Sequence, residues 1–175
     1  MNIEIRNTKV EDATAIKKLH QAITDFPDGI IRRPDEITTA YILQLIQAAT
    51  ESGLALVATQ EDKVIGEIHA HTPKIFAFQH LLTDLTIMVD PGYHNLGVGS
   101  KLFKTFLDKV QSQYPHILRV ELFVREHNAK NVGFYQNLGF VNEGRQVDKI
   151  YMGAGQFQTP LAMVWINPDY QNMEA

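Results

Sequence analysis

The chain has 175 residues, of which 45% are apolar and 21% charged, and its formal net charge is −4. These values are ordinary for one globular domain with a substantial core, and they give no general attraction to nucleic acid or to anionic membranes. The sequence has no cysteine, which excludes disulfides, thiolate metal sites and a cysteine nucleophile, and which agrees with a reducing compartment.

The N-terminal segment predicts a short strand followed by a helix. Apolar and polar residues alternate in Asn2–Arg6, and Thr8–Asp12 then offers residues that cap a helix. The expected helix has an apolar face with residues three and four apart, namely Ala13, Ile16, Leu19 and Ile23. Phe26–Gly29 has the composition of a turn and ends this unit.

A second helix is predicted to begin at Pro34–Glu36, where a proline is followed by two acids that suit the positive end of the helix dipole. Its expected apolar face consists of Ile37, Tyr41, Leu45 and Ala48. Gly53 closes this helix. Leu54–Thr59 and Val64–Ala70 are then predicted as the two strands of a hairpin, and His71–His80 receives no assignment.

The stretch Leu85–Phe106 is the part of the sequence around which the rest is organised. Its first apolar residues alternate, which predicts a half-buried strand with Leu85, Ile87 and Val89 on one face. Turn residues at Asp90–Gly92 end this strand. After a loop that contains glycines the apolar spacing becomes helical, with a face made of Val98, Leu102, Phe103, Phe106 and Val110.

A strand that enters a helix through a glycine-bearing turn leaves free N–H groups at the helix N-terminus, and these groups suit a phosphate. Two well-known phosphate loops are excluded here. The NTPase P-loop needs Lys and then Ser or Thr where Val98 and Gly99 stand. The dinucleotide-binding pattern needs a third glycine where Leu102 stands.

The sequence after the central helix predicts a further strand and helix. Apolar residues alternate in Leu118–Val124, which predicts the strand. The helix is expected over Ala129–Leu138, with Asn128 as its N-cap and Gly139 at its C-terminal cap position.

The C-terminal region predicts a last pair of antiparallel strands. They are Phe140–Val147 and Thr159–Ile166, separated by a loop that contains Gly153 and Gly155. The complete order of elements predicts one α/β domain over residues 1–175, with a mixed central sheet flanked by helices.

Two motifs in this chain resemble those of the GNAT (Gcn5-related N-acetyltransferase) family. The pyrophosphate loop of that family is usually Arg or Gln, two residues, Gly, one residue, then Gly or Ala, and here it is His94-Asn95-Leu96-Gly97-Val98-Gly99. His94 departs from the usual residue and can still donate a hydrogen bond to phosphate. The second motif consists of an Asn, a Tyr seven residues later and a closing Gly-Phe, and here these positions are Asn128, Tyr135, Gly139 and Phe140. Asn131 stands where a small residue is common in the family.

The resemblance covers residues 82–140 well and implies a GNAT-like fold, in which coenzyme A lies where two central strands splay apart. The main chain of Ile87, Met88 and Val89 would hold the pantetheine arm and the thioester carbonyl, and would stabilise the oxyanion. His94 and the N–H groups of the loop would bind the pyrophosphate, the latter in Asn95, Leu96, Gly97, Val98, Gly99 and Ser100. Asn128 and Asn131 would contact the cofactor, and Tyr135 would donate its phenolic proton to the departing thiolate.

The general base is left open. Asp84 is the first candidate, because its parity on the central strand is opposite to that of the apolar residues and would turn it towards the acceptor. Glu67, His69 and Glu121 on neighbouring strands are weaker candidates. His69 and His71 alone are too few ligands for a metal site, so no metal is expected.

The resemblance implies an acetyl-CoA-dependent N-acetyltransferase that acetylates a primary amine by direct attack in a ternary complex, with Tyr135 as the general acid. Two alternatives stay open: a noncatalytic acyl-CoA-binding or regulatory domain on the same scaffold, and an acyltransferase for longer acyl groups or for ester formation. The acceptor, a small molecule or a peptide, is not identified. Phe26–Arg33, His71–His80 and Tyr151–Gln158 are the segments expected to select it.

The remaining expectations concern location and partners. The N-terminal segment has no apolar signal-peptide core and no apolar run approaches about 20 residues, so a cytoplasmic protein is expected. No nucleic-acid or membrane partner is expected, and a homodimer stays open. A local basic patch that would suit a phosphorylated cofactor is expected from Lys101, Lys104, Arg125 and Lys130.

Overall fold

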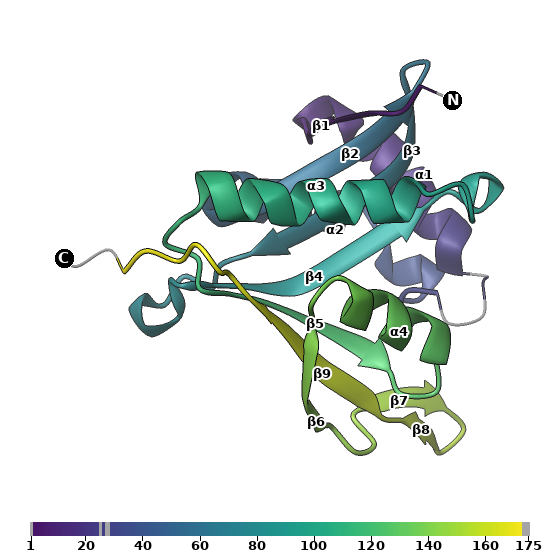
Figure 1. Cartoon of the computed structure of the whole chain (residues 1–175). Coiled ribbons are helices and arrows are strands. Elements are labelled where there is room, and N and C mark those ends of the chain that lie inside the picture. The colour runs from purple at the N-terminus through teal and green to yellow at the C-terminus, as the bar shows by residue number, and fades with distance from the viewer. Residues whose placement is uncertain (1, 25, 27–28, 173–175) are drawn as a thin grey trace.

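The computed structural model describes residues 2–24, 26 and 29–172, and a β-sheet with helices on both of its faces occupies this part of the chain (Figure 1). The helices in the described ranges are α1 (Ala13–Thr24), α2 (Thr39–Ser52), α3 (Val98–Gln113) and α4 (Ala129–Asn137). The strands in the same ranges are β1 (Glu4–Asn7), β2 (Gly53–Gln60), β3 (Lys63–His71), β4 (Leu81–Val89), β5 (Arg119–Arg125), β6 (Val141–Arg145), β7 (Ile150–Gly153), β8 (Gln156–Gln158) and β9 (Pro160–Ile166).

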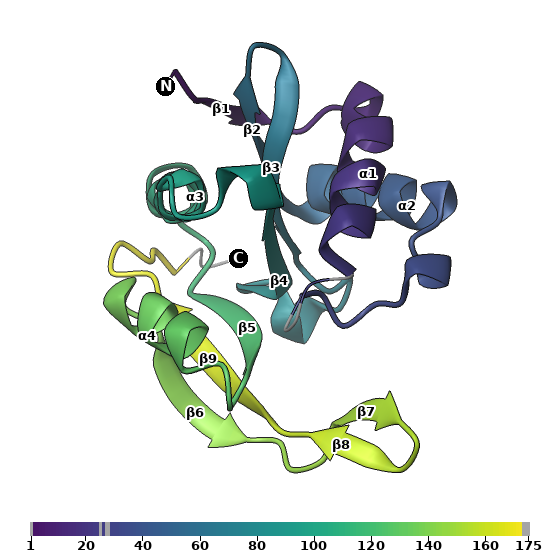
Figure 2. The same ribbon diagram turned by 90° about the vertical axis from the view of Figure 1, so that its right-hand side faces the viewer.

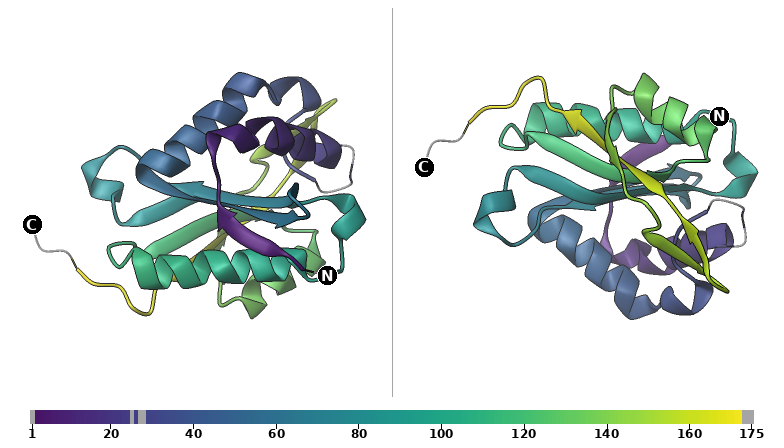
Figure 3. Two further views of the ribbon diagram at one scale, coloured as in Figure 1. Left: turned by 90° about the horizontal axis from the view of Figure 1, so that it is seen from above. Right: turned by 90° about the horizontal axis from the view of Figure 1, so that it is seen from below.

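The main sheet is mixed and has the strand order β1-β2-β3-β4-β5-β9-β6. Its neighbouring strands are antiparallel except for β4 and β5, which are parallel. Helices α1 and α2 cover one face, while α3 and α4 lie on the other (Figure 2; both views of Figure 3). The predicted α/β class, a mixed sheet flanked by helices, is confirmed.

The two central strands part soon after they pair. In β4 and β5 only Leu81 with Arg119 and Leu82 with Val120 are in register, and the strands then diverge towards their C-terminal ends (Figure 1). The expected splay of two central strands is therefore confirmed. Beyond Leu82, one edge of β4 has no neighbouring strand in the described part of the chain.

A bulge in β4 changes the alternation of its side chains. Asp84 has a φ of 54°, and the register between β3 and β4 shifts at this point. As a result Leu82 and Leu85, three residues apart, both pack in the cluster under α3, where strict alternation would place them on opposite faces. Met88 faces the other way, towards α1 and α2.

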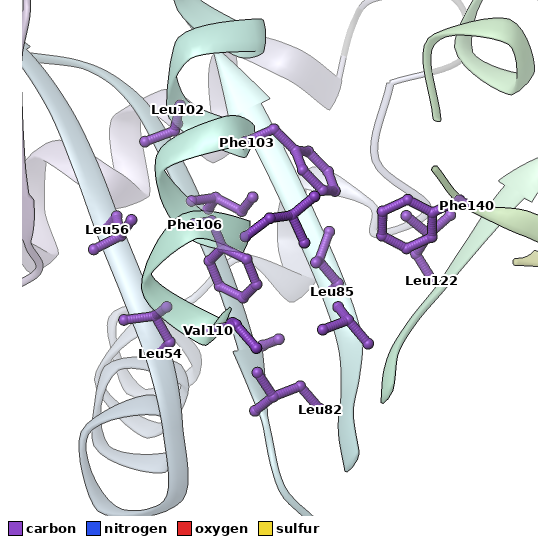
Figure 4. Close-up of a cluster of buried hydrophobic side chains, with 14 of the residues drawn as sticks. Leu54, Leu56, Leu82, Leu85, Leu102, Phe103, Phe106, Val110, Leu122 and Phe140 are labelled. Carbon is purple, nitrogen blue, oxygen red and sulfur yellow. The ribbon is translucent and has the colours of Figure 1, made fainter. Parts of the chain in front are cut away.

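The core lies in two layers, one on each face of the sheet. Below α3, the apolar stripe that the sequence predicts is buried against the strands, with Phe103 and Phe106 fully enclosed (Figure 4). Phe103 also contacts Phe140, with ring centroids 5.6 Å apart, so this cluster joins the β4 side of the splay to the β5 side. The other layer packs α1 and α2 against the sheet and includes Ile16 of α1 and Ile46 of α2.

The prediction for the second helix is wrong at its start and in part of its buried face. Pro34–Glu36 forms a separate 3₁₀ turn, and α2 begins only at Thr39. The Thr38 hydroxyl caps α2 by accepting a hydrogen bond from the Tyr41 N–H (3.1 Å). With this later start, the buried face consists of Ile42, Leu45, Ile46 and Ala49.

Three segments complete the comparison with the predicted elements. The strand pair β6 and β9 is confirmed, but the loop between them contains the hairpin β7–β8, whose turn includes Gly153 and Gly155 at positive φ. The unassigned His71–His80 contains the end of β3 and a 3₁₀ turn at Phe76–Phe78. Of the predicted turn Phe26–Gly29, residues 27 and 28 lie outside the described residues.

Candidate functional site

A cleft of about 1050 Å³ opens where β4 and β5 diverge. One wall is formed by β4, including its bulge and the main chain of Ile87 and Val89. The opposite wall is formed by the end of β5 and by α4, with Asn128 and Tyr135. Helices α1 and α2, residues 29–32 and the end of β3 contribute most of the remaining lining, which therefore comes from elements on both faces of the sheet.

The unpaired edge of β4 presents main-chain N–H and C=O groups along the cleft. Met88 and Ile87 are in register with Glu67 and Ile68 of β3 on one side only. In an antiparallel pair the hydrogen-bonding groups of alternate residues point to one neighbour, and those of the residues between them point away. Part of the main chain of the predicted Ile87–Val89 segment therefore faces the cleft, where it can bind an extended amide-bearing ligand.

The glycine loop presents the N-terminus of α3 without a side-chain cap. Gly97, at the N-cap position, has a φ of 79°, and Asn95 also lies in the left-handed region at 61°. A Cβ on Gly99 would meet only a methyl of Val89, at 3.6 Å. The N–H groups of the first turn, from Val98 to Ser100, thus remain available for an anion at the positive end of a 16-residue helix.

His94 anchors this loop to β4. Its Nε2 lies 2.9 Å from the carbonyl oxygen of Val89 and donates to it, and its ring packs edge to face with Phe26, with centroids 6.1 Å apart. From the sequence, we expect His94 to donate a hydrogen bond to a phosphate. Because Nε2 carries the donated proton, Nδ1 of the neutral ring is an acceptor, and it can donate to a phosphate only when the imidazole is protonated.

The expected basic patch is divided among several partners. Lys130 lies beside the glycine loop, with its Nζ 3.3 Å from Asn95 Oδ1, and it lines the cleft. Lys101 instead donates to the main-chain carbonyl of Ile3 (2.7 Å), and Arg125 donates to that of Gly29 (2.7 Å). Of Lys101, Arg125 and Lys130, it is therefore Lys130 that lies nearest the loop with its amino group directed towards it.

Helix α4 places its polar residues as its motif predicts. Asn128 caps the helix by accepting a hydrogen bond from the Asn131 N–H (3.1 Å), and Gly139, at a φ of 92°, follows its C-terminal end. Asn128, Asn131 and Tyr135 all line the cleft. They share a face because seven residues are nearly two helical turns.

Tyr135 is set among aromatic rings. Its ring centroid lies 5.7 Å from that of Phe103, 5.4 Å from Phe134 and 6.0 Å from Phe140. Burial raises the pKa of Tyr135 to about 12. The phenol therefore stays protonated at neutral pH, and in the described part of the chain its hydroxyl has no hydrogen-bond partner.

This pKa defines what the Tyr135 phenol can do. An ordinary thiol has a pKa of about 8.5, so complete proton transfer from Tyr135 to a thiolate is uphill in the free site. Donation of a hydrogen bond to a developing thiolate needs no such transfer. At neutral pH the buried phenol is therefore available as a hydrogen-bond donor.

The four candidate bases occupy different environments. Asp84 lies at the cleft wall with its carboxylate 67% exposed and 3.7 Å from His71 Nε2. Glu121 does not reach the cleft, because it forms an ion pair with Arg119 (2.7 Å) on β5. His69 lines the cleft, and its Nδ1 lies 2.8 Å from Oε1 of the fully buried Glu67.

Sequence reasoning missed His20, which lies behind His69. The two imidazoles are stacked with centroids 6.3 Å apart, and His20 Nε2 lies 3.5 Å from Glu67 Oε2. His20 is only 1% exposed, and among the described residues neither of its ring nitrogens has a hydrogen-bond partner. The available signal was its position beside Leu19 in the apolar stripe of α1, where a polar side chain is unusual.

Within residues 2–24, 26 and 29–172, no group of three or more His, Asp or Glu side chains is arranged to hold a metal ion. No helix there is both long and apolar enough to cross a bilayer.

Comparison with known proteins gives a family and several similar structures. The model of the acetyltransferase (GNAT) family matches residues 16–140. A GNAT-family acetyltransferase from Streptococcus pneumoniae is 25% identical, with a TM-score of 0.76 over 94% of this chain and 99% of that one. A search of curated proteins gives no significant match.

Two more distant structures share the fold. The putative acetyltransferase yncA from Salmonella typhimurium, solved with acetyl-CoA, has a TM-score of 0.85 at 17% identity and covers 100% of this chain and 99% of its own. A phosphinothricin acetyltransferase from Sinorhizobium meliloti, in complex with acetyl-CoA, has a TM-score of 0.83 at 15% identity, over 99% of this chain and 93% of its own. With the family match spanning most of the sequence, the splayed strands, the glycine loop and the tyrosine helix, this chain belongs to the GNAT acetyltransferase family.

Proposed function

We propose that the protein is an acetyl-CoA-dependent N-acetyltransferase that acetylates a primary amine by direct attack while both substrates are bound. The observation that carries this proposal is the cleft at the parting of β4 and β5. The uncapped N-terminus of α3 follows β4, with its Gly99 beside Val89 of the cleft wall, and Tyr135 lies in the opposite wall. Family membership supports the same reaction class.

The residues of the cleft fit coenzyme A. The N–H groups from Val98 to Ser100 are unoccupied donors at a helix N-terminus, and Lys130 adds a positive charge beside the loop. The free edge of β4 offers main-chain partners for the amides of a pantetheine arm, and Asn128 and Asn131 face it from α4. Bound there, acetyl-CoA supplies an activated acyl group as a thioester.

Tyr135 acts as the general acid in this proposal. It is the protonated donor in the wall of the cleft, and its aromatic surroundings hold its ring in one place. As the bond between the acyl carbon and sulfur breaks, negative charge grows on sulfur, and a donor aimed at that atom stabilises it. The main chain of β4 provides the corresponding N–H groups for the carbonyl oxygen.

The acceptor binds on the side of the cleft formed by α1, α2 and the segment between them. Residues 30–32 and Tyr41 line this region, together with Ile150 from the β7–β8 hairpin. Arg32 lies over the Tyr41 ring at 4.0 Å. We infer that these segments select a small-molecule or peptide amine, and we expect the enzyme to act in the cytoplasm.

The test is release of the coenzyme A thiol from acetyl-CoA in the presence of a panel of amines. In Tyr135→Phe we expect turnover to fall by about 10²-fold or more, with binding of acetyl-CoA by calorimetry largely retained. Tyr114→Phe is the matched control, because Tyr114 lies outside the cleft at the end of α3. Unchanged turnover in Tyr135→Phe contradicts the acid role, and binding of acetyl-CoA without turnover of any amine favours a noncatalytic binding domain.

A further inference from the structure

We propose that His69 is the general base that removes a proton from the acceptor ammonium, and that the buried Glu67 positions it. This assignment rests on the proposed acetyl transfer and adds the residue that activates the amine. Both side chains point from β3 towards the α1 and α2 side of the sheet, where the acceptor is expected, and His69 is part of the cleft wall.

The hydrogen bond between the two residues fixes the imidazole. Glu67 is completely buried and its Oε1 lies 2.8 Å from His69 Nδ1. An ionised carboxylate only accepts hydrogen bonds, so Nδ1 carries the proton and Nε2 carries the free lone pair. In the described part of the chain Nε2 has no partner, which leaves it available to a ligand in the cleft.

The position of His69 matches the position of the reacting groups. His69 is in register with Thr86 of β4, immediately before the main chain of Ile87 and Met88. Neighbouring strands lie about 4.8 Å apart, so the imidazole is one strand away from the segment expected to hold the thioester. An amine that approaches this segment from the α1 and α2 side passes His69.

Glu67 is held as an anion in a buried place. Burial by itself raises the pKa of this carboxyl, but the two histidines beside it outweigh burial and hold the pKa of Glu67 below its ordinary value. A carboxylate that accepts from Nδ1 stabilises the imidazolium that forms when Nε2 takes a proton. Glu67 does this without contacting the substrate, so it is a positioning residue.

Other titratable or charged groups line the same cleft and come from each element packed around this pair. They are His20 from α1, Tyr41 from α2 with Arg32 over its ring, Asp84 from β4, His71 from β3, and Glu36 and Arg125 at the rim of the cleft. The strand neighbours of His69, Ala55 and Thr86, carry no charge. The His20 ring is stacked on that of His69, with centroids 6.3 Å apart.

Geometry favours His69 over Asp84. The Asp84 carboxylate is 67% exposed and lies near His71, whereas the His69 ring is enclosed and oriented by a dedicated partner. Imidazole titrates at about pH 6.5 in peptides and carboxylates at about 4, so imidazole is the better matched acceptor for a proton from an alkylammonium.

The acceptor ammonium loses two protons as the amide forms. The acceptor nitrogen gives one proton to His69 Nε2, which later releases it to water, and the freed lone pair forms the bond to the acyl carbon. The carbon–sulfur bond breaks, its electron pair stays on sulfur, and Tyr135 protonates that sulfur. The second proton lost by the nitrogen restores the phenol. The products are the amide, the coenzyme A thiol and one proton in solution.

The experiment measures kcat/KM against pH for the wild type and for His69→Gln, Glu67→Gln and Asp84→Asn, with His116→Gln as the matched control outside the cleft. For His69→Gln we expect loss of the acidic limb of the profile and a fall of about 10²–10³-fold, with acetyl-CoA binding by calorimetry retained. Glu67→Gln should keep the limb but move its midpoint to lower pH, because the imidazolium loses its anion. Asp84→Asn and His116→Gln should keep the limb in place.

The remaining outcomes are each decisive. An unchanged acidic limb in a folded His69→Gln overturns the assignment, and loss of the limb in Asp84→Asn assigns the base to Asp84. If His69→Gln does not fold, ¹⁵N NMR of the wild type decides: a neutral His69 protonated at Nδ1, titrating at the midpoint of the limb, supports the proposal, and one protonated at Nε2 overturns it. If the wild type turns over no amine, the proposed function fails, and the base assignment fails with it.

Discussion

Arg6 and Asp12 show how single residues tie the start of the chain to the first helix. The guanidinium donates to both carboxylate oxygens of Asp12 at 2.8 Å, and the Lys9 N–H donates to one of them at 2.8 Å. The hydrogen bonds from Arg6, opposed by burial and aided by the Lys9 N–H, hold the pKa of Asp12 below its ordinary value. This paired carboxylate links β1 to the entry of α1.

Asp12→Asn should lower the free energy of unfolding at pH 7 by about 1–3 kcal/mol, because charge-assisted hydrogen bonds are lost at a buried site. A carboxyl with a lowered folded-state pKa stabilises above its unfolded pKa, and this contribution disappears as the pH falls through the folded value. The difference between wild type and variant should therefore shrink below about pH 4. Urea denaturation at several pH values measures it.

Asp35→Asn is the control for this prediction. Its partner Arg33 lies 2.9 Å away, but both side chains are largely exposed, so the loss should be small. Equal losses in the two variants, or a difference that does not vary with pH, would contradict the role given to Asp12.

The residues of the candidate site were predictable where a motif marks them. Asn128, Asn131 and Tyr135 follow from helical spacing and family resemblance, and the structure places all three in the cleft wall. The position of His20 in the apolar stripe of α1 indicates only that it is buried, and its proximity to Glu67 comes from the packing of α1 on the sheet. Glu121 appeared equivalent to Glu67 in sequence, yet the fold directs it to Arg119.

Among the elements, the loop before α3 combines backbone conformation with ligand access. Gly97 adopts a φ of 79° at the helix N-cap, a conformation that costs an L-residue about 1–2 kcal/mol. A Cβ there would meet no atom within 4 Å, so the cost is conformational and not steric. The same glycine sets the direction of the N–H groups that follow.

Gly97→Ala should lower the free energy of unfolding by about 1–2 kcal/mol and should weaken acetyl-CoA binding. Gly133→Ala in α4 is the matched control: no atom lies within 4 Å of its added Cβ, its φ is ordinary, and alanine favours a helix. Chemical denaturation and calorimetry measure both effects. If the two substitutions change acetyl-CoA binding equally, the prediction is wrong, and the backbone conformation at Gly97 is not needed to bind the cofactor.

Elements with a long and regular apolar period were predicted well. The stripes of α1 and α3 and the β2–β3 hairpin are all present. The start of α2 was wrong because Pro34–Glu36 has the composition of a helix start but closes on itself as a 3₁₀ turn. The bulge at Asp84 left no sign in the sequence, since its left-handed φ is imposed by the pairing of β3 with β4.

At the scale of the whole molecule, the sheet consists of two parts with few main-chain links between them. Strand β4 pairs with β5 only at Leu81 and Leu82. Beyond these residues, a cluster of aromatic side chains on the α3 side connects the two parts. Phe103 of α3 contacts Phe134, Tyr135 and Phe140 on the β5 side. Its ring therefore links stability to the position of the proposed acid.

Phe103→Leu should lower the free energy of unfolding by about 1–3 kcal/mol and also reduce kcat, because Tyr135 loses one of the rings that hold it. Phe106→Leu is the control: Phe106 is equally buried and contacts Phe103, but it has no ring contact with Tyr135. It should lose similar stability and keep its kcat. A normal kcat in stable Phe103→Leu preparations would show that packing does not position the phenol.

The divergence of β4 and β5 leaves an opening through the sheet that can be reached from both of its faces. This opening is lined by Asn128 and Tyr135 on one face of the sheet and by His20 and Tyr41 on the other. In the proposed reaction, acetyl-CoA and the amine enter this opening from opposite faces of the sheet and are bound at the same time. Double-reciprocal plots of the initial rate at varied amine and acetyl-CoA concentrations should consequently intersect. Parallel lines would mean that one product must leave before the second substrate binds.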